Sequence, residues 1–546
     1  MKFIKSNYVI LFIVFVGTVF RLWDLSNNPP HLTPDEAALG YNAYSIMQTG
    51  RDEHGQFLPI IFKSFGDYKP GLYIYLITPL IWMFGLTEIA VRLPSALAGI
   101  ISIYLIFLIV KQLFQDKRLA IIAAALLALN PWSIHFSRAA WEVNLALGFA
   151  LGALYLFLLA FEKQKYLYFS VVFFGLTLLT YQGAKLSSGL LIIILFILHF
   201  KKLFKFNFKI LAGSVLLGFV IALPIIFSFT TGKTGRLTVF SVFSYPRPDD
   251  YLAAFLSEAS VSKDSLVYYF FYSEPLNFLR GILGRYFNHF STRFLFFVGD
   301  WQNVRHTPPY HGTMLLADLP FLLLGFFAIF KNRLKKEHWF VILWLFLSPL
   351  PSALSRDQIH AVRALNMLVP LVIITAFGVN YFFKNYRNLA IALIIILYIP
   401  ALTYFLDAEF VHLPKSQSKL WEYGYKQIVA EINPIQNDYD EIVVQQSYAQ
   451  PYIYFLFFQK YPPAKFQNQN NFVENKYGDV GQVTELGKIK FEPIDWSVRR
   501  GQKGKLFVGD PIKIPVADIS SDEHKVVSEI KYLDGEPAFR LVEIKK

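Results

Sequence analysis

The sequence contains no cysteine and few charged residues. Without cysteine there is no disulfide framework, no thiol nucleophile and no cysteine-ligated metal. Charged residues make up 17% of the 546 residues, whereas soluble domains contain about 25%. The hydrophobic share is 54% and the mean hydropathy is +0.40. These values predict a polytopic membrane protein, and the net charge of +13 comes from basic residues between apolar blocks rather than from a nucleic-acid-binding domain.

Twelve apolar segments approach the length that crosses a bilayer as a helix, which is about 20 residues. The first is predicted to be an uncleaved transmembrane helix, because no clear small-residue cleavage site follows it. The twelve segments begin near Tyr8, Leu72, Arg92, Leu119, Val143, Leu167, Leu186, Ile210, Met314, Trp339, Ala364 and Leu389.

The segment 72–86 decides the topology. It is short and carries Tyr73, Tyr75 and Trp82, which suit the membrane–water interface. If it lies along the interface, five basic loops ("QDKR", "EKQK", "HFKKLFKFNFK", "KNRLKK" and "KNYR") all face the cytoplasm, as the positive-inside rule requires. The sequence therefore predicts eleven crossings in the cell membrane, with a cytoplasmic N-terminus and an extracytoplasmic C-terminus.

Two domains are predicted. Residues 1–406 form the membrane domain, with large outer loops at 26–91 and 230–313. Residues 407–546 change in composition: "WEYGYKQIVAEI" has helical spacing, and "EIVVQQ", "KLFVGD", "KVVSEIKYL" and "AFRLVEIKK" have the pattern of strands. The expected fold is mainly α, with about eleven transmembrane helices, interfacial helices and a small outer α/β domain.

The stretch "HLTPDEAALG" follows the first apolar segment closely. Thr33 as N-cap, Pro34 at the first helical position and Glu36 three residues after the cap predict a capped helix start. Capping accounts for Glu36. It accounts for Asp35 only loosely, through the favourable position of an acid near a helix N-terminus.

The order of four motifs resembles the GT-C membrane glycosyltransferases, and most closely glycosyltransferase family 39, the protein O-mannosyltransferases and aminoarabinose transferase-like enzymes. The motifs are Asp35–Glu36, "GDYKPGLYIYL" around Lys69–Pro70, "VRLPSALAG" at 91–99, and "NPWSIHFSRAAWEVNLAL" at 130–147. The resemblance is specific through about residue 150 and says little about the C-terminal domain.

This resemblance implies that a hexose or pentose is transferred from a polyprenyl phosphate to an acceptor on the extracytoplasmic side, with inversion at the anomeric carbon. Asp35 matches the catalytic aspartate and is expected to act as general base, with Glu36 in support. No cofactor is required, although a divalent metal ion stays open. The acceptor is a protein, a lipid or a glycan, because no motif encodes it or the sugar.

The resemblance further implies a site for the donor phosphate, formed by Lys69, Arg92 and Arg138, to which we add Arg363 from its place beside an apolar segment. Each residue also has a simpler interpretation. Lys69 and Arg363 suit anchors at the lipid surface, and Arg92 suits a structural bond to Glu88.

Seven further polar residues are expected to line the cavity. His306 and His311, five apart and near Asp300, form only a weak metal-ligand pattern, so polar lining is preferred. Glu142 stands where the family commonly has aspartate, which leaves its role open. The seven residues are Glu142, Tyr181, Lys185, Arg305, His306, His311 and His360.

Two other functions are compatible with these features. A lipid-linked-sugar transporter or flippase would place polar groups at mid-membrane, whereas here they gather in loops on one side. A glycan-binding scaffold would not need Asp35.

Overall fold

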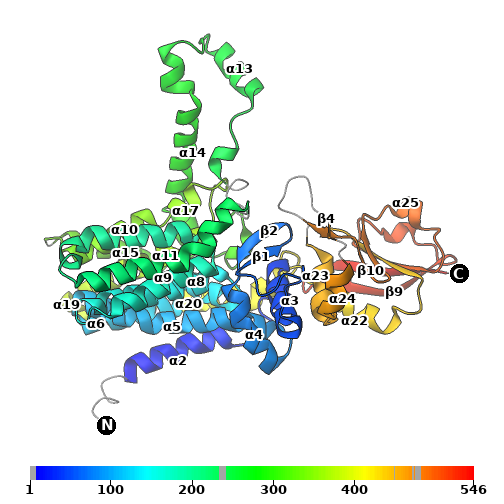
Figure 1. Cartoon of the computed structure of the whole chain (residues 1–546), viewed down its shortest axis with the longest axis horizontal. Helices are drawn as coiled ribbons and strands as arrows, with labels where there is room; N and C mark the ends of the chain where they lie inside the picture. Colours follow the sequence, from blue (N-terminus) through cyan, green and yellow to red (C-terminus); the bar gives the residue numbers. More distant parts are fainter. Residues whose placement is uncertain are drawn as a thin grey trace.

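The computed structural model describes residues 8–232, 241–331, 333–447, 449–469, 472–473 and 481–545. A bundle of roughly aligned helices forms one part, and a sheet domain adjoins one end of it (Figure 1). The predicted fold class, mainly helical with a small C-terminal α/β region, is confirmed.

A helix lies at each of the eleven predicted crossings. Six of the helices that the structure describes are long and apolar enough to cross a membrane, and a seventh candidate is the pair α6 and α7 (Pro131–Arg138), which is bent by 52°. The other apolar helices are shorter, so the number of crossings stays a prediction. The eleven are α2 (Tyr8–Leu22), α5 (Glu88–Phe114), α6 (Lys117–Leu129), α8 (Glu142–Ala160), α9 (Tyr166–Thr180), α10 (Ala184–Leu203), α11 (Phe208–Thr230), α15 (Asp318–Phe330), α16 (Lys336–Leu347), α19 (Leu368–Asn385) and α20 (Arg387–Asp407).

Close backbone approach fixes the pairing of α15 with α19. A Cβ added at Gly378 would lie 1.9 Å from the carbonyl oxygen of Phe321, and one added at Gly325 would lie 1.9 Å from that of Ile374. Only glycine fits at these two positions. Small residues at helix interfaces serve this purpose in membrane bundles, where apolar side chains gain little from leaving lipid.

The segment between the first two spans forms α3 (Pro34–Thr49), the hairpin β1 (Ile61–Ser64) with β2 (Asp67–Pro70), and α4 (Leu72–Phe84). These elements lie at the end of the bundle that faces the sheet domain (Figure 1). The predicted cap is confirmed: Thr33 and Glu36 form a capping box with Pro34 at the start of α3. The helix α4 has 13 residues, contains Pro79 and is shorter than a span, in agreement with an interfacial position.

The second large loop forms an arm that projects from the bundle across the direction of its helices (Figure 1). The chain then returns to the bundle end through short helical turns. The arm contains η1 (Val242–Ser244), α13 (Asp249–Glu258), the π-helical turn η2 (Tyr268–Tyr272) and α14 (Glu274–Asn288), and the turns that follow it are η3 (Arg293–Phe297) and η4 (Val304–His306). Three further short helices lie in the later connection between α16 and α19: α17 (Leu350–Ala353), α18 (Ala361–Ala364) and η5 (Leu365–Met367).

The C-terminal domain contains a mixed six-stranded sheet in the order β6-β7-β3-β8-β10-β9. The four predicted strands are present as β3 (Glu441–Gln445), β8 (Lys505–Gly509), β9 (His524–Lys531) and β10 (Pro537–Ile544). The remaining elements are α22 (Tyr425–Ile435), α23 (Pro451–Phe458), α24 (Pro463–Gln469), β4 (Phe472–Val473), β5 (Gln482–Val483), β6 (Glu485–Leu486), β7 (Ile489–Glu492), α25 (Trp496–Arg499) and η7 (Val516–Asp518).

This domain packs directly on α3. The Tyr41 hydroxyl donates to the carbonyl oxygen of Tyr461 (3.0 Å), and the Tyr454 hydroxyl donates to that of Leu32 (3.1 Å). One hydrophobic core includes side chains of α3, α4, α22 and α23. The two parts therefore share a core at the end of the bundle.

The segment that joins the parts, η6 (Ala408–His412) and α21 (Leu413–Ser416), contacts the membrane domain. Glu409 lies just beyond the predicted boundary at 407 and is fully buried against His135, whose Nδ1 lies 3.0 Å from its carboxylate. Leu413 packs with Ala139 and Trp421.

Candidate active site

Asp35 and Lys69 form an ion pair and a hydrogen bond at the start of α3. The Asp35 side chain is 54% exposed, whereas that of Lys69 is 11% exposed. Lys69 is held by the β1–β2 hairpin, in register with Phe62. A carboxylate that is open to solvent thus lies next to an ammonium group that the fold holds in place.

Glu36, the neighbour of Asp35, has a structural role. One carboxylate oxygen accepts from the backbone N–H of Thr33 (2.9 Å). The other accepts from the N–H of Ala140 (2.9 Å) and from the guanidinium of Arg92 (3.1 Å). Because the side chain is buried and these donors occupy both oxygens, Glu36 fixes α3 to α5 and to the turn after α7. Its supporting catalytic role stays a prediction.

Arg92 and Arg138, which were predicted to bind the donor phosphate, are both fully buried, and that role stays a prediction. Arg92 donates to the carbonyl oxygens of Leu25, Pro29 and His31 at 2.7–2.9 Å. The expected bond to Glu88 does not form, since Glu88 pairs with Lys426 (2.6 Å).

Arg138 makes an equivalent set of bonds. It donates to the carbonyl oxygens of Phe20, Trp23 and Asn28 at 2.7–2.8 Å, and Glu409 lies 3.7 Å away. The two arginines thereby hold the irregular segment between α2 and α3, whose backbone oxygens would otherwise lack partners inside the protein.

Glu53 lies near the Asp35–Lys69 pair and was not predicted from the sequence. Its carboxylate accepts from the amide of Asn42 (2.9 Å) and its backbone N–H donates to the same side chain (3.0 Å). Burial raises the pKa of Glu53 to about 8, although the charge of Lys69 acts in the opposite direction. Only its adjacency to Asp52 in "RDEHG" marked it in the sequence.

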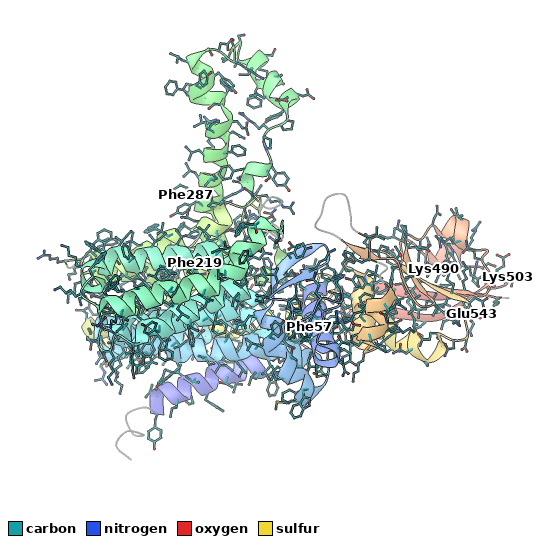
Figure 2. All side chains as sticks on the ribbon, in the orientation of Figure 1. Phe57, Phe219, Phe287, Lys490, Lys503 and Glu543 are labelled. Carbon is teal, nitrogen blue, oxygen red and sulfur yellow. The ribbon has the colours of Figure 1, made fainter. Side chains whose placement is uncertain are left out.

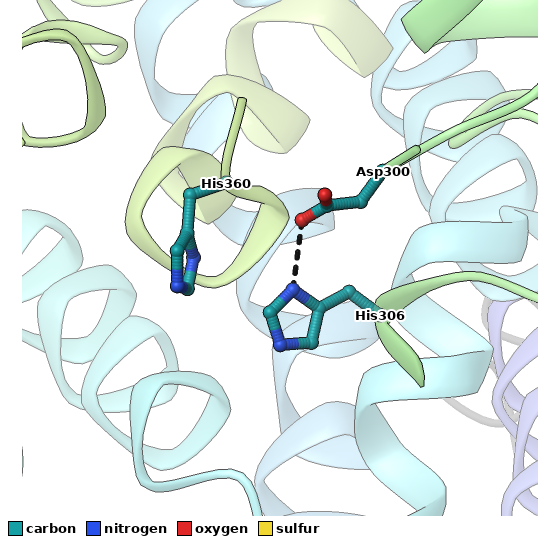
Figure 3. Close-up of side chains that lie close together, drawn as sticks. All are labelled: Asp300, His306 and His360. Carbon is teal, nitrogen blue, oxygen red and sulfur yellow. Dashed lines mark hydrogen bonds and ion pairs between the residues drawn. The ribbon is translucent and has the colours of Figure 1, made fainter. Parts of the chain in front are cut away.

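A second polar group contains Asp300, His306 and His360 (Figure 3). The Nδ1 atom of His306 lies 2.8 Å from Asp300 Oδ2, which also accepts from the N–H of Ala361 (2.8 Å). The rings of His306 and His360 lie 4.8 Å apart. Burial lowers the pKa of His306, against the opposing effect of Asp300, so this histidine tends to be neutral.

These three side chains bring one ligand atom each to within 4.8 Å of one another. Two imidazoles and a carboxylate suit zinc and similar ions. An ion would have to replace the hydrogen bond between His306 and Asp300. His311, the partner in the weak pattern noted in the sequence, instead faces Tyr404 and Phe405 of α20, and His360 is the second histidine of the group.

Arg363 is linked to His360 of this second group by Asp357, which contacts both. Its guanidinium lies 2.5 Å from Asp357, whose carboxylate also lies 3.9 Å from Arg356 and from His360. A cavity of ≈ 440 Å³ adjoins them, lined by Val242, Tyr245, Arg285, Gln302, Arg356 and Asp357. The prediction for Arg363 therefore stays open, with Arg356, its neighbour in the sequence motif, and Arg285, which was not predicted, as additional cations.

The turn between α9 and α10 packs beside β2. Gln182 donates to the carbonyl oxygen of Tyr68, so Tyr181 and Lys185 lie near the hairpin that carries Lys69. The Lys185 ammonium lies 5.0 Å from the ring of Phe229. Glu142 is half-buried at the start of α8.

The two polar groups are joined by one short segment. Ala140 donates to Glu36, which adjoins Asp35 in the sequence, and the indole of Trp141 lies 5.3 Å from the ring of His306. The backbone oxygen of Arg305, next to His306, accepts a hydrogen bond from His135 Nε2 (2.8 Å). Most of the predicted polar residues thus gather at one end of the bundle.

A family model described as dolichyl-phosphate-mannose-protein mannosyltransferase matches residues 68–227. The crystal structure of ArnT from Cupriavidus metallidurans bound to undecaprenyl phosphate superposes with a TM-score of 0.57 at 12% identity, and 98% of each chain is covered. The chain has the GT-C fold. The Archaeoglobus fulgidus oligosaccharyltransferase in its apo form also matches, with a TM-score of 0.52 and 14% identity over 93% of this chain and 70% of that one.

The predicted GT-C fold is therefore confirmed, and its long apolar helices are those of a multi-pass membrane protein. A comparison with curated proteins finds no match. The matched family segment of this GT-C chain includes Lys69 but begins after Asp35. What the site can do chemically follows from the pair itself: an accessible carboxylate can accept a proton, and the adjacent ammonium can stabilise an anion.

Proposed function

We propose that the protein transfers a sugar from a polyprenyl phosphate to an acceptor on the extracytoplasmic side, with inversion and with Asp35 as general base. The observation that carries the proposal is the Asp35–Lys69 pair, a half-exposed carboxylate beside a held ammonium group at the end of a GT-C bundle. ArnT was crystallised with undecaprenyl phosphate, which supports a donor of this chemical class.

In the proposed reaction the acceptor oxygen or nitrogen attacks the anomeric carbon from the face opposite the phosphate. The new glycosidic bond forms as the bond between the anomeric carbon and the phosphate oxygen breaks. The acceptor proton passes to an Asp35 carboxylate oxygen. The departing polyprenyl phosphate takes the bonding electron pair, and Lys69 stabilises its growing negative charge.

The ion pair then describes the state of the site before substrate binds. When a donor phosphate arrives, it competes with Asp35 for the Lys69 ammonium. Release of Asp35 from this partner makes the carboxylate available to the acceptor, so donor binding would prepare the base. Arg285 and Arg356, which line the cavity beside the second polar group, provide further cationic groups for an anionic substrate.

The test is a transfer assay in proteoliposomes with a panel of polyprenyl-phosphate sugars, comparing wild type with Asp35→Asn. We expect wild type to form a glycosidic bond of inverted anomeric configuration with at least one donor, and Asp35→Asn to form it about 10² to 10⁴-fold more slowly. Glu88→Gln is a matched control, since Glu88 is an acid at the same end of the bundle with its own partner, Lys426.

Two outcomes would reject the proposal. Movement of an intact lipid-linked sugar across the bilayer would identify a transporter. Unchanged transfer by Asp35→Asn would remove the general base. The absence of cysteine permits a test of sidedness: single cysteines at exposed Asp438 and Lys165 should react with an impermeant maleimide from opposite sides of the membrane.

A further inference from the structure

The arm, residues 241–290, exposes apolar side chains to an unusual degree. At its tip Leu266 is 76% exposed and Phe270 is 70% exposed, with Tyr269 and Phe271 beside them. These side chains belong to the turn η2 and the residues before it. Large contiguous apolar patches are rare on surfaces that face water and mark a contact with a partner or with lipid.

The helix α14 continues this surface toward the bundle. Leu279, Leu283 and Phe287 are all exposed and are spaced four residues apart, so they form one stripe along the helix. Phe287 lies near the root of the arm (Figure 2). The opposite side of α14 is occupied in part, since Phe278 packs against Phe243 of η1.

The arm has the orientation of an element that lies in the plane of a membrane. It stands across the direction of the spans, near the end that carries α3 (Figure 1). Its root is fixed to the bundle, where the N–H of Val242 donates to the carbonyl oxygen of Leu354 (3.1 Å). The span that precedes it, α11, exposes apolar side chains along its length, such as Val215 at 74%. The lipid-facing surface of α11 therefore leads to the arm.

We propose that the arm lies flat in the lipid–water interface at this end of the bundle, with the tip and the α14 stripe among the acyl chains. The occupant of the apolar surface is the bilayer itself. Residues 241–290 contain four basic and five acidic side chains, so attachment comes from burial of apolar and aromatic groups rather than from attraction to anionic lipids. The inference depends on the spans crossing a bilayer and not on sugar transfer.

An arm in the interface also fixes the depth, relative to the bilayer, of the cavity at the root of the arm. Tyr245 and Arg285 belong to the arm and line that cavity together with Arg356. With the arm in the interface, these guanidinium groups lie at the depth of lipid head groups. An anionic head group would then reach them by lateral diffusion within the leaflet.

The test uses single cysteines labelled with an environment-sensitive fluorophore, which the cysteine-free chain permits without background. Phe270→Cys and Leu283→Cys are reconstituted in phosphatidylcholine vesicles that contain acyl-chain nitroxide lipids. Val215→Cys on α11 is the lipid-exposed reference. Ile512→Cys, an apolar position of the C-terminal domain that is 81% exposed, is the matched reference in water.

We expect the probes at 270 and 283 to show blue-shifted emission and to be quenched as strongly as the probe at 215, with or without anionic lipid, while the probe at 512 is not quenched. Emission of the arm probes that matches the probe at 512 would overturn the proposal. A blue shift that depends on protein density and not on nitroxide lipid would overturn it in favour of a second copy, and a requirement for anionic lipid would overturn its apolar basis.

Discussion

The motif residues of this protein divide into two kinds, and the pair Asp35–Lys69 contrasts with the pair Glu36–Arg92. Both are acid–base pairs at the start of α3. The first has a carboxylate that is 54% exposed, whereas in the second the two side chains are 4% and 0% exposed. The exposed pair can exchange its partner for a ligand. The buried pair is already hydrogen-bonded to backbone groups. The two pairs therefore have the same charges but different roles.

The largest effect is expected at the exposed carboxylate. Asp35→Asn should reduce sugar transfer by about 10² to 10⁴-fold, which is the range that loss of a general base produces. The melting temperature in detergent should not change, because the side chain is half-exposed. If Asp35→Asn lost both activity and stability, Asp35 would have a structural role like that of Glu36.

The buried pair should respond in the opposite way. Arg92→Met leaves Glu36 and three carbonyl oxygens without their donor, and breaking a buried pair costs about 3–5 kcal/mol. We expect a much lower melting temperature and little folded protein. Lys69→Met is the comparison: it should remain folded and lose transfer activity. A stable Arg92→Met variant with impaired donor binding would instead support the phosphate-binding role predicted for Arg92.

Asp300→Asn tests the second polar group. The carboxylate accepts from His306 and from the N–H of Ala361, so the loss of these bonds should reduce stability by about 1–3 kcal/mol. We expect the same decrease in melting temperature with and without a chelator. If a chelator lowered the melting temperature of wild type but not that of Asp300→Asn, the group would instead be a metal site. His311→Gln, outside the group, is the control for chelation.

The smallest effect concerns Glu53 and pH. Its pKa of about 8 lies above the ordinary value of 4.5, so between these pH values the folded state holds a proton that the unfolded state has released. Stability therefore falls as pH rises through this window. Glu53→Gln should flatten the dependence of melting temperature on pH, whereas Glu523→Gln, at an exposed position, should leave it as in wild type. If the melting temperature of wild type rose with pH relative to that of Glu53→Gln, Glu53 would not be neutral in the folded protein.

The arrangement of a helical bundle followed by a small sheet domain was predicted well from the sequence, because apolar patterning along the chain determines it. The cap at Thr33, the short helix α4 and four strands of the C-terminal domain all follow from local patterns. The expectation that Asp35 and Lys69 belong to one site followed only from the resemblance to a family, since 34 residues separate them, and their direct ion pair was not predicted.

What the sequence could not predict depends on contacts between distant segments. Arg92 and Arg138 looked like ligands for phosphate because nothing local shows that the carbonyl oxygens of residues 20–31 need donors. Glu409 lies 274 residues from His135, and His360 joins His306 only when two loops meet. The same holds for Glu53, whose pKa depends on burial and not on its neighbours in the chain.

The helix α3 has the proposed base at its first turn and the C-terminal domain along its side. Gly40 shows how tight that seam is, since a Cβ there would lie 2.5 Å from the ring of Phe457. The C-terminal domain is thus part of the support of α3: a truncation at residue 424 would expose the side of the helix that carries the proposed base. Chimaeras that exchange this domain between relatives would need to carry α3 with it, and activity lost by truncation would report a damaged base rather than a missing acceptor site.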